Sequence, residues 1–412
     1  MINIFFVLKQ IIKACQMIFI DEMKLEPTIA KNDALMENVW MMTICIELRI
    51  PLFLVGKPGS SKSLAKTIVT DVMQGQNSYS ELFKAFKEIH MVSFQCSPLA
   101  TAGGILSIFK QCQKYQENRK ANLSSFSAVC ILDEVGLAED SAKMPLKALH
   151  PLLEDGCIGD EPREDWKKVS FVGISNWALD PAKMNRGILL SRGVPSQDDL
   201  VKIAKGICSS DPDAQERMAT VFKDLAQGYY HLYSIQKREF FGLRDFYSLV
   251  KMLFRVISEK EDGSQLSLNE KMEAIQRNFG GYFEDLKPAL QFLQKIQPDF
   301  QENKLISSKD LILKAMEVPE NPTETRYLLL LTKNNAALRI IEEHELIGNE
   351  YSVIYGSSFP LDQEYTQICS NIQRIKIAME TGQTVILSNL DNLYESLYDA
   401  LNQNYMFLGD NR

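Results

Sequence analysis

Short, nearly continuous hydrophobic runs alternate with amphipathic helical patterns over the first half of the chain. The runs cover residues 52–55, 91–94, 128–132 and 169–174. Apolar residues recur at helical spacing before the first run, at 30–48, and between successive runs, at 63–73, 105–117 and 144–153. Strands without a polar face are typical of parallel sheets that are covered on both sides. The pattern therefore predicts an α/β domain with three layers.

The strand pattern stops near Val201, and a helical region follows. Its predicted helices cover 214–233, 243–259, 268–278 and 283–296. Residues 298–325 contain three prolines and predict a linker around one short helix. Beyond it we expect strands at 327–331, 352–355 and 384–387 and helices at 336–343 and 365–380. The predicted organisation is an N-terminal helix (1–25), a large α/β domain (26–201), a helical domain (202–297), the linker (298–325) and a partial second α/β module (326–412).

Residues 1–20 are strongly apolar, but Lys9, Gln10, Lys13 and Gln16 interrupt them. A membrane span needs a longer apolar run, and the basic start and small-residue cleavage site of a secretion signal are not clear here. Because the apolar positions recur at helical spacing, we expect a packed helix; the alternative is a membrane or targeting segment. We also expect the chain to be a fragment or a truncated gene product.

The composition is that of an ordinary globular protein, with 412 residues of which 45% are apolar and 24% charged. The net charge of −8 argues against broad binding of nucleic acid or of an anionic membrane. The eight cysteines form no Cys-x2-Cys pair, so we expect neither a zinc finger nor a RING domain within this chain. Scattered cysteines in apolar runs indicate a reducing compartment, and we expect a cytoplasmic protein.

A glycine-containing loop from Gly56 to Ser63 joins the first predicted strand to a predicted helix. This context is that of a P-loop, in which backbone N–H groups point at phosphate oxygens. We expect Lys62 to reach the β- and γ-phosphates of ATP and the Ser63 hydroxyl to bind Mg²⁺. Ser61 departs from the pattern, because a glycine usually stands there. The alternative is an ordinary glycine-rich turn. The candidate ATP-binding residues here are Gly56, Pro58, Gly59, Ser60, Ser61, Lys62, Ser63 and Leu64.

An acidic pair, Asp133-Glu134, ends the fully apolar run at 128–132 and lies 133 − 56 = 77 residues beyond Gly56. That separation leaves room for a strand and a helix, and we expect the two motifs on adjacent central strands. Asp133 would hold Mg²⁺, and Glu134 would act as the general base that polarises the attacking water. Alone the pair is a weak signal, because acidic residues often end strands as solvated turn residues; together with the loop it is strong.

Three further residues are candidates for the reaction. Asn176 ends the run at 169–174 and could position water against the γ-phosphate, or be a turn residue. Arg186 could reach the γ-phosphate of a neighbouring module, or be solvated. Arg244 starts a helix among aromatic residues and could fold back onto the nucleotide, or pair with Asp245.

With these parts in order, the chain resembles the AAA+ ATPases. The resemblance implies that 56–63 is the Walker A motif, Asp133-Glu134 the Walker B motif, and the helical region the lid. It also implies that Asn176 is sensor 1, Arg186 the arginine finger and Arg244 sensor 2. ATP and Mg²⁺ are the implied cofactors, and neighbouring AAA+ modules of the same or another chain are the implied partners.

Several segments also resemble the mysterin family of giant RING-type ubiquitin ligases, which carry a dynein-like string of AAA+ modules. These segments are 50–63, 93–98, 137–141, 149–157, 174–187 and 240–245. The ligase and zinc-binding portions of that family have no counterpart here, so ligase activity and the ubiquitin machinery as a partner are implied only through absent domains. Association with lipid droplets is likewise implied only by the family.

The second module carries a degenerate version of the loop. Residues 353–363 follow a predicted strand and precede a helix, but Leu361 stands where the mysterin pattern has a lysine. The run at 384–387 lies 387 − 356 = 31 residues beyond Gly356, against 94 − 56 = 38 for the second strand of the first module. We therefore match it to that second strand, and expect the chain to contain one full module and part of another.

Two hypotheses about function remain open. In the first, the first module is an ATP-hydrolysing AAA+ module. In the second, it binds nucleotide without hydrolysis and serves as a scaffold, as the departures at Ser61 and Leu361 indicate. A switch GTPase is a third class, but it would need an Asn-Lys-x-Asp motif, which the sequence lacks.

Overall fold

The computed structural model describes residues 4–157, 162–236, 240–260, 262–281, 287–316, 327–348, 350–357, 359 and 365–401. The chain separates into two compact units. Unit 1 comprises Met1–Phe279 and Pro288–Phe300, and unit 2 comprises Gly280–Lys287 and Gln301–Arg412. Leu361 and Arg326 lie outside the described residues.

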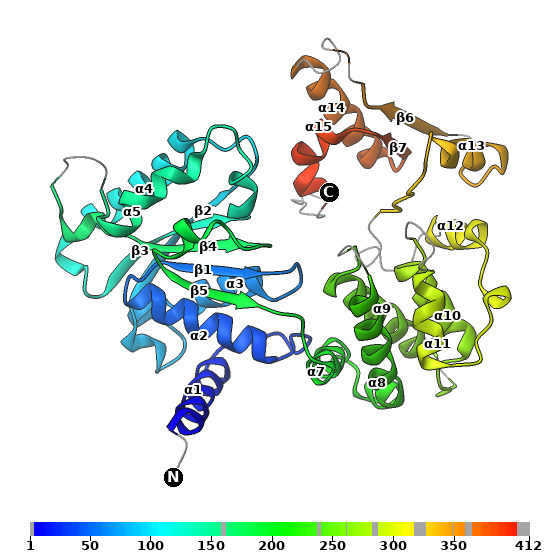
Figure 1. Cartoon of the computed structure of the whole chain (residues 1–412), viewed down its shortest axis with the longest axis horizontal. Helices are drawn as coiled ribbons and strands as arrows, with labels where there is room; N and C mark the ends of the chain where they lie inside the picture. The colour runs from blue at the N-terminus through cyan, green and yellow to red at the C-terminus, as the bar shows by residue number, and fades with distance from the viewer. Residues whose placement is uncertain are drawn as a thin grey trace. The chain divides into compact units, whose positions relative to one another are not determined.

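A parallel sheet of five strands forms the centre of unit 1 (Figure 1). Its strands are β1 (Leu52–Gly56), β2 (Glu88–Gln95), β3 (Phe126–Asp133), β4 (Ser170–Ser175) and β5 (Ile188–Arg192). The first four confirm the predicted strands. The fifth was not predicted, because it is a short edge strand whose side chains are mostly exposed and whose apolar run has three residues, Ile188–Leu190.

The order of the strands is β2-β3-β4-β1-β5. The prediction that the glycine loop and the acidic pair end adjacent strands is therefore wrong, because β4 lies between β1 and β3. Sequence separation does not fix strand order. After β1 the chain crosses to β2 at the edge of the sheet and then returns through β3 to β4, which pairs with β1.

Alternate residues of the strands enter two separate cores. On one face, Leu52 and Leu54 pack with α2 (Asp33–Glu47) and α3 (Lys62–Val72). On the other face, Phe53 and Val55 pack with α4 (Ala102–Glu117) and α5 (Leu149–Glu154). The helix predicted at 144–153 starts instead as a 3-10 turn, Pro145–Ala148, and continues as α5. The three-layer α/β architecture is confirmed.

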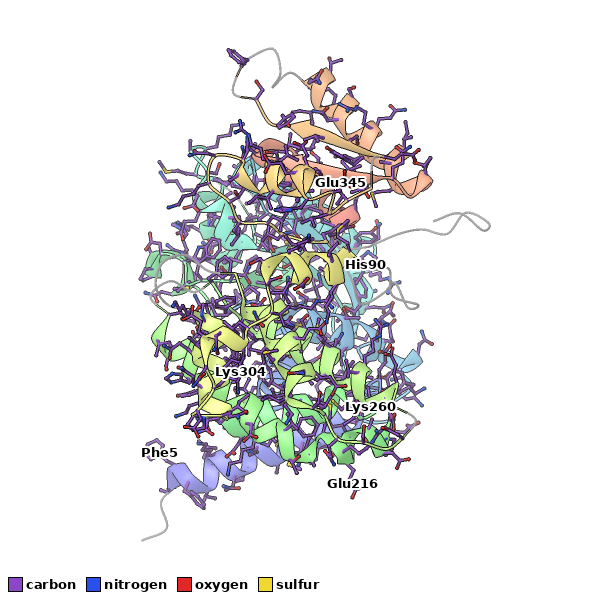
Figure 2. The ribbon with its side chains drawn as sticks, turned by 90° about the vertical axis from the view of Figure 1, so that its right-hand side faces the viewer. Phe5, His90, Glu216, Lys260, Lys304 and Glu345 are labelled. Carbon is purple, nitrogen blue, oxygen red and sulfur yellow. The ribbon has the colours of Figure 1, made fainter. Side chains whose placement is uncertain are left out.

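The predicted N-terminal helix is confirmed as α1 (Ile4–Asp21), but only part of it packs against the rest of unit 1. Its last turns bury Ile20 and bring the Phe19 ring within 5.4 Å of the Phe83 ring centroid. Its first turns project from unit 1, and Phe5, labelled at that end in Figure 2, is 83% exposed. The helical spacing of apolar residues in α1 predicted more burial than the structure shows, because no described segment covers its first turns. Among the described helices, none has the length and apolar character needed to cross a membrane.

A helical layer follows the sheet within unit 1. It contains α7 (Gln197–Ile207), α8 (Pro212–Ile235), α9 (Leu243–Ser258), α10 (Leu268–Phe279) and α11 (Pro288–Ile296). Aromatic residues from four of these helices form its core: Tyr229, Phe246, Phe279 and Phe292. The predicted helical region is confirmed, with α7 as an additional helix. The short α6 (Pro181–Met184) precedes β5.

The first α-helices in the described part of unit 2 are α12 (Ser308–Met316) and α13 (Ala336–Glu343). Its two strands, β6 (Tyr351–Tyr355) and β7 (Thr384–Ser388), pair in parallel on either side of α14 (Tyr365–Thr381) in sequence. Two short helices follow, α15 (Asp391–Tyr394) and α16 (Tyr398–Leu401).

Two expectations for unit 2 need correction. Residues 327–331 are irregular rather than a strand, and Leu329 is 75% exposed. The expected correspondence between β7 and β2 of unit 1 also does not agree with the strand pairing. β7 pairs directly with β6, whereas β3 and β4 separate β2 from β1. Loop length alone was a poor guide to strand position.

Candidate functional site

The loop between β1 and α3 turns sharply at residues with left-handed backbone. Gly59 has a φ of +89°, and a Cβ atom there would lie 2.8 Å from Cβ of Leu243. Ser61 has a φ of 59°. Ser61 therefore adopts the conformation that explains why glycine usually stands at this position.

The Lys62 side chain is buried beneath this loop, with 6% of the residue exposed. Its Nζ donates hydrogen bonds to the carbonyl oxygens of Gly56 at 2.5 Å and Lys57 at 3.0 Å. Burial lowers the pKa of Lys62 to about 8, and the nearby Arg244 adds to this, while Asp133 and Glu134 act in the opposite direction. The loop thus holds an ammonium group that has been partly stripped of water and that an anion would stabilise.

The start of α3 offers hydrogen-bond donors beside that ammonium group. Within the described part of the chain, the side chain of the N-cap residue Ser61 makes no capping bond to α3. The first N–H groups of a helix have no partner within it, and its N-terminus carries partial positive charge. Ser63, in the first turn, is exposed. The ammonium group of Lys62 and the first N–H groups of α3 can bind a polyphosphate within this tight loop. The Ser63 hydroxyl is available to a divalent metal ion.

The acidic pair lies where β3 ends. Asp133 Oδ1 accepts a hydrogen bond from the backbone N–H of Glu134 at 3.1 Å, and Glu134 itself has a left-handed backbone with a φ of 51°. Burial, and next the charge of Asp133, raise the pKa of Glu134, although a hydrogen bond from the Gln95 side chain opposes the shift. A carboxylate with a raised pKa is better matched to accepting a proton near neutral pH.

The sheet brings these groups to one edge. Because the strands are parallel, Gly56, Asp133 and Asn176 all lie at its carboxyl end, with Asn176 directly after β4 and hence between the other two. Ligands of open parallel sheets bind at this end. The structure therefore assembles the predicted loop, acidic pair and Asn176 although β1 and β3 are not neighbours.

Arg244 joins the site from the helical layer. Leu243 packs on Gly59, and the Tyr247 hydroxyl donates a hydrogen bond of 2.8 Å to the Gly59 carbonyl oxygen. Arg244, in the first turn of α9, is close enough to lower the pKa of both Lys62 and Glu134. Asp245 accepts a hydrogen bond from the backbone N–H of Gly242 at 2.7 Å and so caps its own helix. α9 therefore packs on the loop and places Arg244 near Lys62 and Glu134. Burial raises the pKa of Asp245, and the charge of Arg244 opposes this shift. Whether Arg244 contacts the nucleotide stays a prediction.

Arg186 lies at the other end of the sheet. It precedes Ile188, which pairs with Leu52 at the amino end of β1, whereas Arg192 pairs with Gly56 at the carboxyl end. The length of β5 between these pairs is about 13 Å at ~3.3 Å per residue. The Arg186 Nε lies 2.7 Å from Oε1 of Glu154. Arg186 is therefore not part of the site formed by the loop of its own unit.

Sequence reasoning missed a buried polar network behind the loop. Arg192 donates a hydrogen bond of 2.7 Å from Nε to Oδ1 of Asn38 and forms an ion pair with Glu37. Asn38 is fully buried, and its Nδ2 donates to the Ser60 carbonyl oxygen at 2.9 Å. The single signal for it in the sequence was a polar residue within the buried stripe of α2.

Replacing Asn38 with alanine is expected to destabilise unit 1 by about 1–3 kcal/mol, because the Ser60 carbonyl and Arg192 would lose a buried partner. Urea unfolding measures the loss, with the exposed Asn122→Ala as the matched control. Equal unfolding midpoints for the two variants would contradict the structural role of this network.

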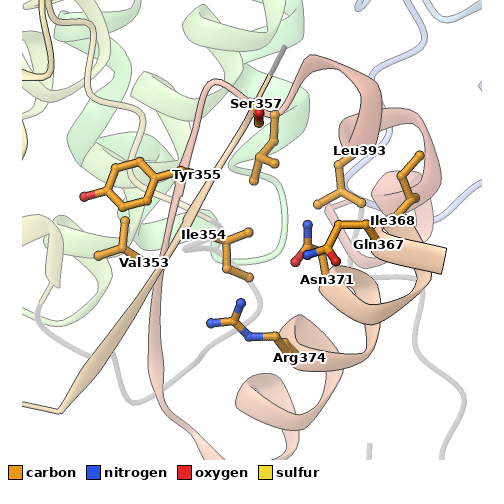
Figure 3. Close-up of a pocket in the computed structure, with 10 residues that line it drawn as sticks. Val353, Ile354, Tyr355, Ser357, Gln367, Ile368, Asn371, Arg374 and Leu393 are labelled. Carbon is orange, nitrogen blue, oxygen red and sulfur yellow. The ribbon is translucent and has the colours of Figure 1, made fainter. Parts of the chain in front are cut away.

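A cavity of about 210 Å³ lies in unit 2 beside β6 and α14 (Figure 3). Its polar lining from α14 includes Gln367, Asn371 and Arg374, which the figure shows along one helix. The lysine position of the degenerate loop, Leu361, lies outside the described residues, so the cavity carries no assignment to a nucleotide site.

The sheet with helices on both faces, the loop at its carboxyl edge and the helical layer that packs on that loop define an AAA+ fold of the P-loop class. Two segments, residues 28–199 and 320–412, match family models described as RNF213 AAA domains. The chain belongs to the RNF213 family, which confirms the resemblance to the mysterin ligases, for which RNF213 is another name.

Sequence relatives agree with this assignment. The chain is 53% identical over 407 residues to the E3 ubiquitin-protein ligase RNF213 of Homo sapiens, and 51% identical over 405 residues to the E3 ubiquitin-protein ligase rnf213-beta of Danio rerio. Each alignment covers 97% of this chain and 8% of the relative. The chain thus spans a small part of the length of the curated relatives it matches.

Among solved structures, this chain overlaps the ORC2 protein of Aeropyrum pernix, whose structure contains ADPNP–ADP complexes. The TM-score is 0.44 and the identity 11%, over 84% of this chain and 87% of that one. PCH-2 of C. elegans overlaps with a TM-score of 0.32 and 13% identity, over 66% of this chain and 69% of that one. Overlaps of this extent add nothing to the assignment.

Proposed function

We propose that unit 1 binds ATP together with Mg²⁺ and hydrolyses it. The observation that carries this proposal is the convergence of Lys62, Asn176 and the Asp133-Glu134 pair at one edge of the sheet. A charged donor, an amide and two carboxylates at a helix N-terminus make a set suited to phosphoryl transfer to water. Membership in the RNF213 family supports a nucleotide-binding AAA+ module.

Each residue has a distinct role in the proposal. Lys62 and the first N–H groups of α3 hold the β- and γ-phosphates, and Arg244 adds positive charge from the helical layer. Asn176 orients the attacking water, and Glu134 accepts its proton. Ser63 and Asp133 are the residues that would hold Mg²⁺, which when bound neutralises charge on the phosphate oxygens. The chemical step then depends mainly on positioning and electrostatic stabilisation.

The position of Arg186 supports a proposal about partners. Because it lies at the amino end of β5, away from the loop of its own unit, we assign it to the site of an adjacent AAA+ module. An arginine supplied by a neighbour stabilises transition-state charge. We propose that unit 1 works in the cytoplasm as an ATPase module of an RNF213-type ligase, with ubiquitin transfer performed by domains beyond this chain.

A second candidate function has one observation in its favour. Asp133, the proposed metal ligand, forms an ion pair with Lys66, with 3.1 Å between Nζ and Oδ2. A carboxylate neutralised in this way would suit a scaffold that binds nucleotide without hydrolysis. Steady-state phosphate release by the chain separates the two functions, because the scaffold binds ATP and releases no phosphate.

The test of nucleotide binding uses pH. The ammonium form of Lys62 binds phosphate, and its pKa of about 8 means that the charge is present below pH 8 and lost above it. ATP affinity is therefore expected to fall roughly tenfold between pH 7.5 and 9. Calorimetric titration with ATP measures the trend. In the matched variant Lys62→Arg the side chain stays charged, and its affinity should vary little over this range.

A wild-type affinity that stays constant from pH 7.5 to 9 would contradict the role of Lys62. Absence of any ATP binding at pH 7.5 would overturn the proposed function itself.

A further inference from the structure

Lys66 lies on α3, one turn beyond Lys62, and reaches the end of β3. Its Nζ lies 3.1 Å from Oδ2 of Asp133. Their side chains are 23% and 17% exposed, so water screens this ion pair less than a pair on the open surface. The contact links α3 with β3 although β4 lies between β3 and the strand from which α3 continues.

Both carboxylate oxygens of Asp133 are engaged in the structure. Oδ1 accepts the backbone N–H of Glu134, and Oδ2 accepts Lys66. The first of these bonds forms within the turn that presents Glu134. The second is made by a cation, and a divalent ion that binds Asp133 must compete with it.

We propose that Lys66 is a positioning residue that occupies Oδ2 of Asp133 and competes with Mg²⁺ for this carboxylate, and that it thereby sets the Mg²⁺ concentration at which ATP is bound productively. The inference rests on the proposed function, because it concerns the same site. Lys66 holds the Asp133 carboxylate in one orientation and offsets the repulsion between Asp133 and Glu134. The ammonium group of Lys66 leaves Oδ2 of Asp133 only when Mg²⁺ binds the carboxylate more strongly.

A purely structural role for Lys66 predicts the opposite change in metal binding. If the ion pair only fixed the Asp133 rotamer, its loss would leave Asp133 misoriented and raise the Mg²⁺ requirement. Under competition, its loss frees the carboxylate and lowers the requirement. The direction of the change therefore separates the two roles.

The experiment measures equilibrium binding of a fluorescent ATP analogue to the 412-residue chain while Mg²⁺ is titrated. In Lys66→Met the half-saturating Mg²⁺ concentration is expected to fall about fivefold, the size of effect that a partly buried ion pair can exert. Without Mg²⁺, the affinity for the analogue should stay equal or fall, because a positive charge has been removed near the phosphates.

Two variants serve as controls. Lys66→Arg keeps the charge and should keep a Mg²⁺ requirement close to that of the wild type. Lys114→Met removes a charge from an exposed position on α4 and should also leave the requirement unchanged. Thermal unfolding of each variant verifies that the fold is intact.

An unchanged or higher Mg²⁺ requirement in Lys66→Met would overturn the inference while leaving ATP binding in place. Failure of the wild-type chain to bind the analogue at any Mg²⁺ concentration would instead overturn the proposed function. The two failures are thus distinguishable.

Discussion

Replacing Lys62 with alanine is expected to abolish ATP binding by unit 1, with a loss of at least about 30-fold in affinity. Lys62 is the buried cation of the loop, and its ammonium group lies beneath the backbone that would surround the phosphates. Losing one partner of a buried, hydrogen-bonded charge pair costs about 2–5 kcal/mol. Calorimetry with ATP, at a pH below 8 where Lys62 is charged, measures the effect.

The control for this variant is Lys114→Ala, which removes a lysine from an exposed helical position. Folding should not confound the result, because Lys62→Ala also removes the cost of burying a charge in the nucleotide-free protein. An affinity within a factor of two of the wild type would exclude the loop as the nucleotide site.

Replacing Glu134 with glutamine is expected to stop phosphate release while ATP remains bound. The amide keeps the size of the side chain but cannot accept the proton of the attacking water, and a positioned general base contributes about 10²–10⁴-fold to the rate. Burial and the neighbouring Asp133 raise the pKa of Glu134, which brings the carboxylate closer to the pH at which it would act. Steady-state phosphate release and ATP affinity, measured in parallel, check the prediction.

Glu117→Gln, an exposed position on α4, is the matched control and should retain the wild-type rate. If Glu134→Gln hydrolyses ATP as fast as the wild type, another group must act as the base. A wild-type chain that binds ATP and releases no phosphate would favour the scaffold function.

Local sequence patterns were sufficient to predict much of unit 1. The strands β1, β3 and β4 are largely apolar, because both of their faces are buried, and the loop and acidic pair follow β1 and the apolar part of β3 directly. Parallel strands share a carboxyl edge in any order, so the sequence could predict that the candidate site residues lie at one edge even though it could not predict the strand order. The exposed edge strand β5 has a shorter run of three apolar residues, which gave too weak a signal.

The residues that support the site could not be predicted, because each acts through a contact between distant segments. Lys66 and Asp133 are 67 residues apart in sequence, and Asn38 and Arg192 are 154 apart. No local pattern pairs such positions; they become neighbours only when the sheet is assembled. The unburied first turns of α1 illustrate the converse, since an apolar stripe specifies a face but not its partner.

The position of β4 gives the site a fixed width. With neighbouring strands ~4.8 Å apart, the phosphate loop and the acidic pair are separated by about 10 Å across the sheet. If ATP binds with its β-phosphate at Lys62, a third phosphate extends across the end of β4 toward Glu134, and a diphosphate is too short to do so. The spacing of the strands would then distinguish ATP from ADP by the length of the phosphate chain. Asn176 follows β4, midway between the loop and the acidic pair, and would contact the third phosphate of ATP alone.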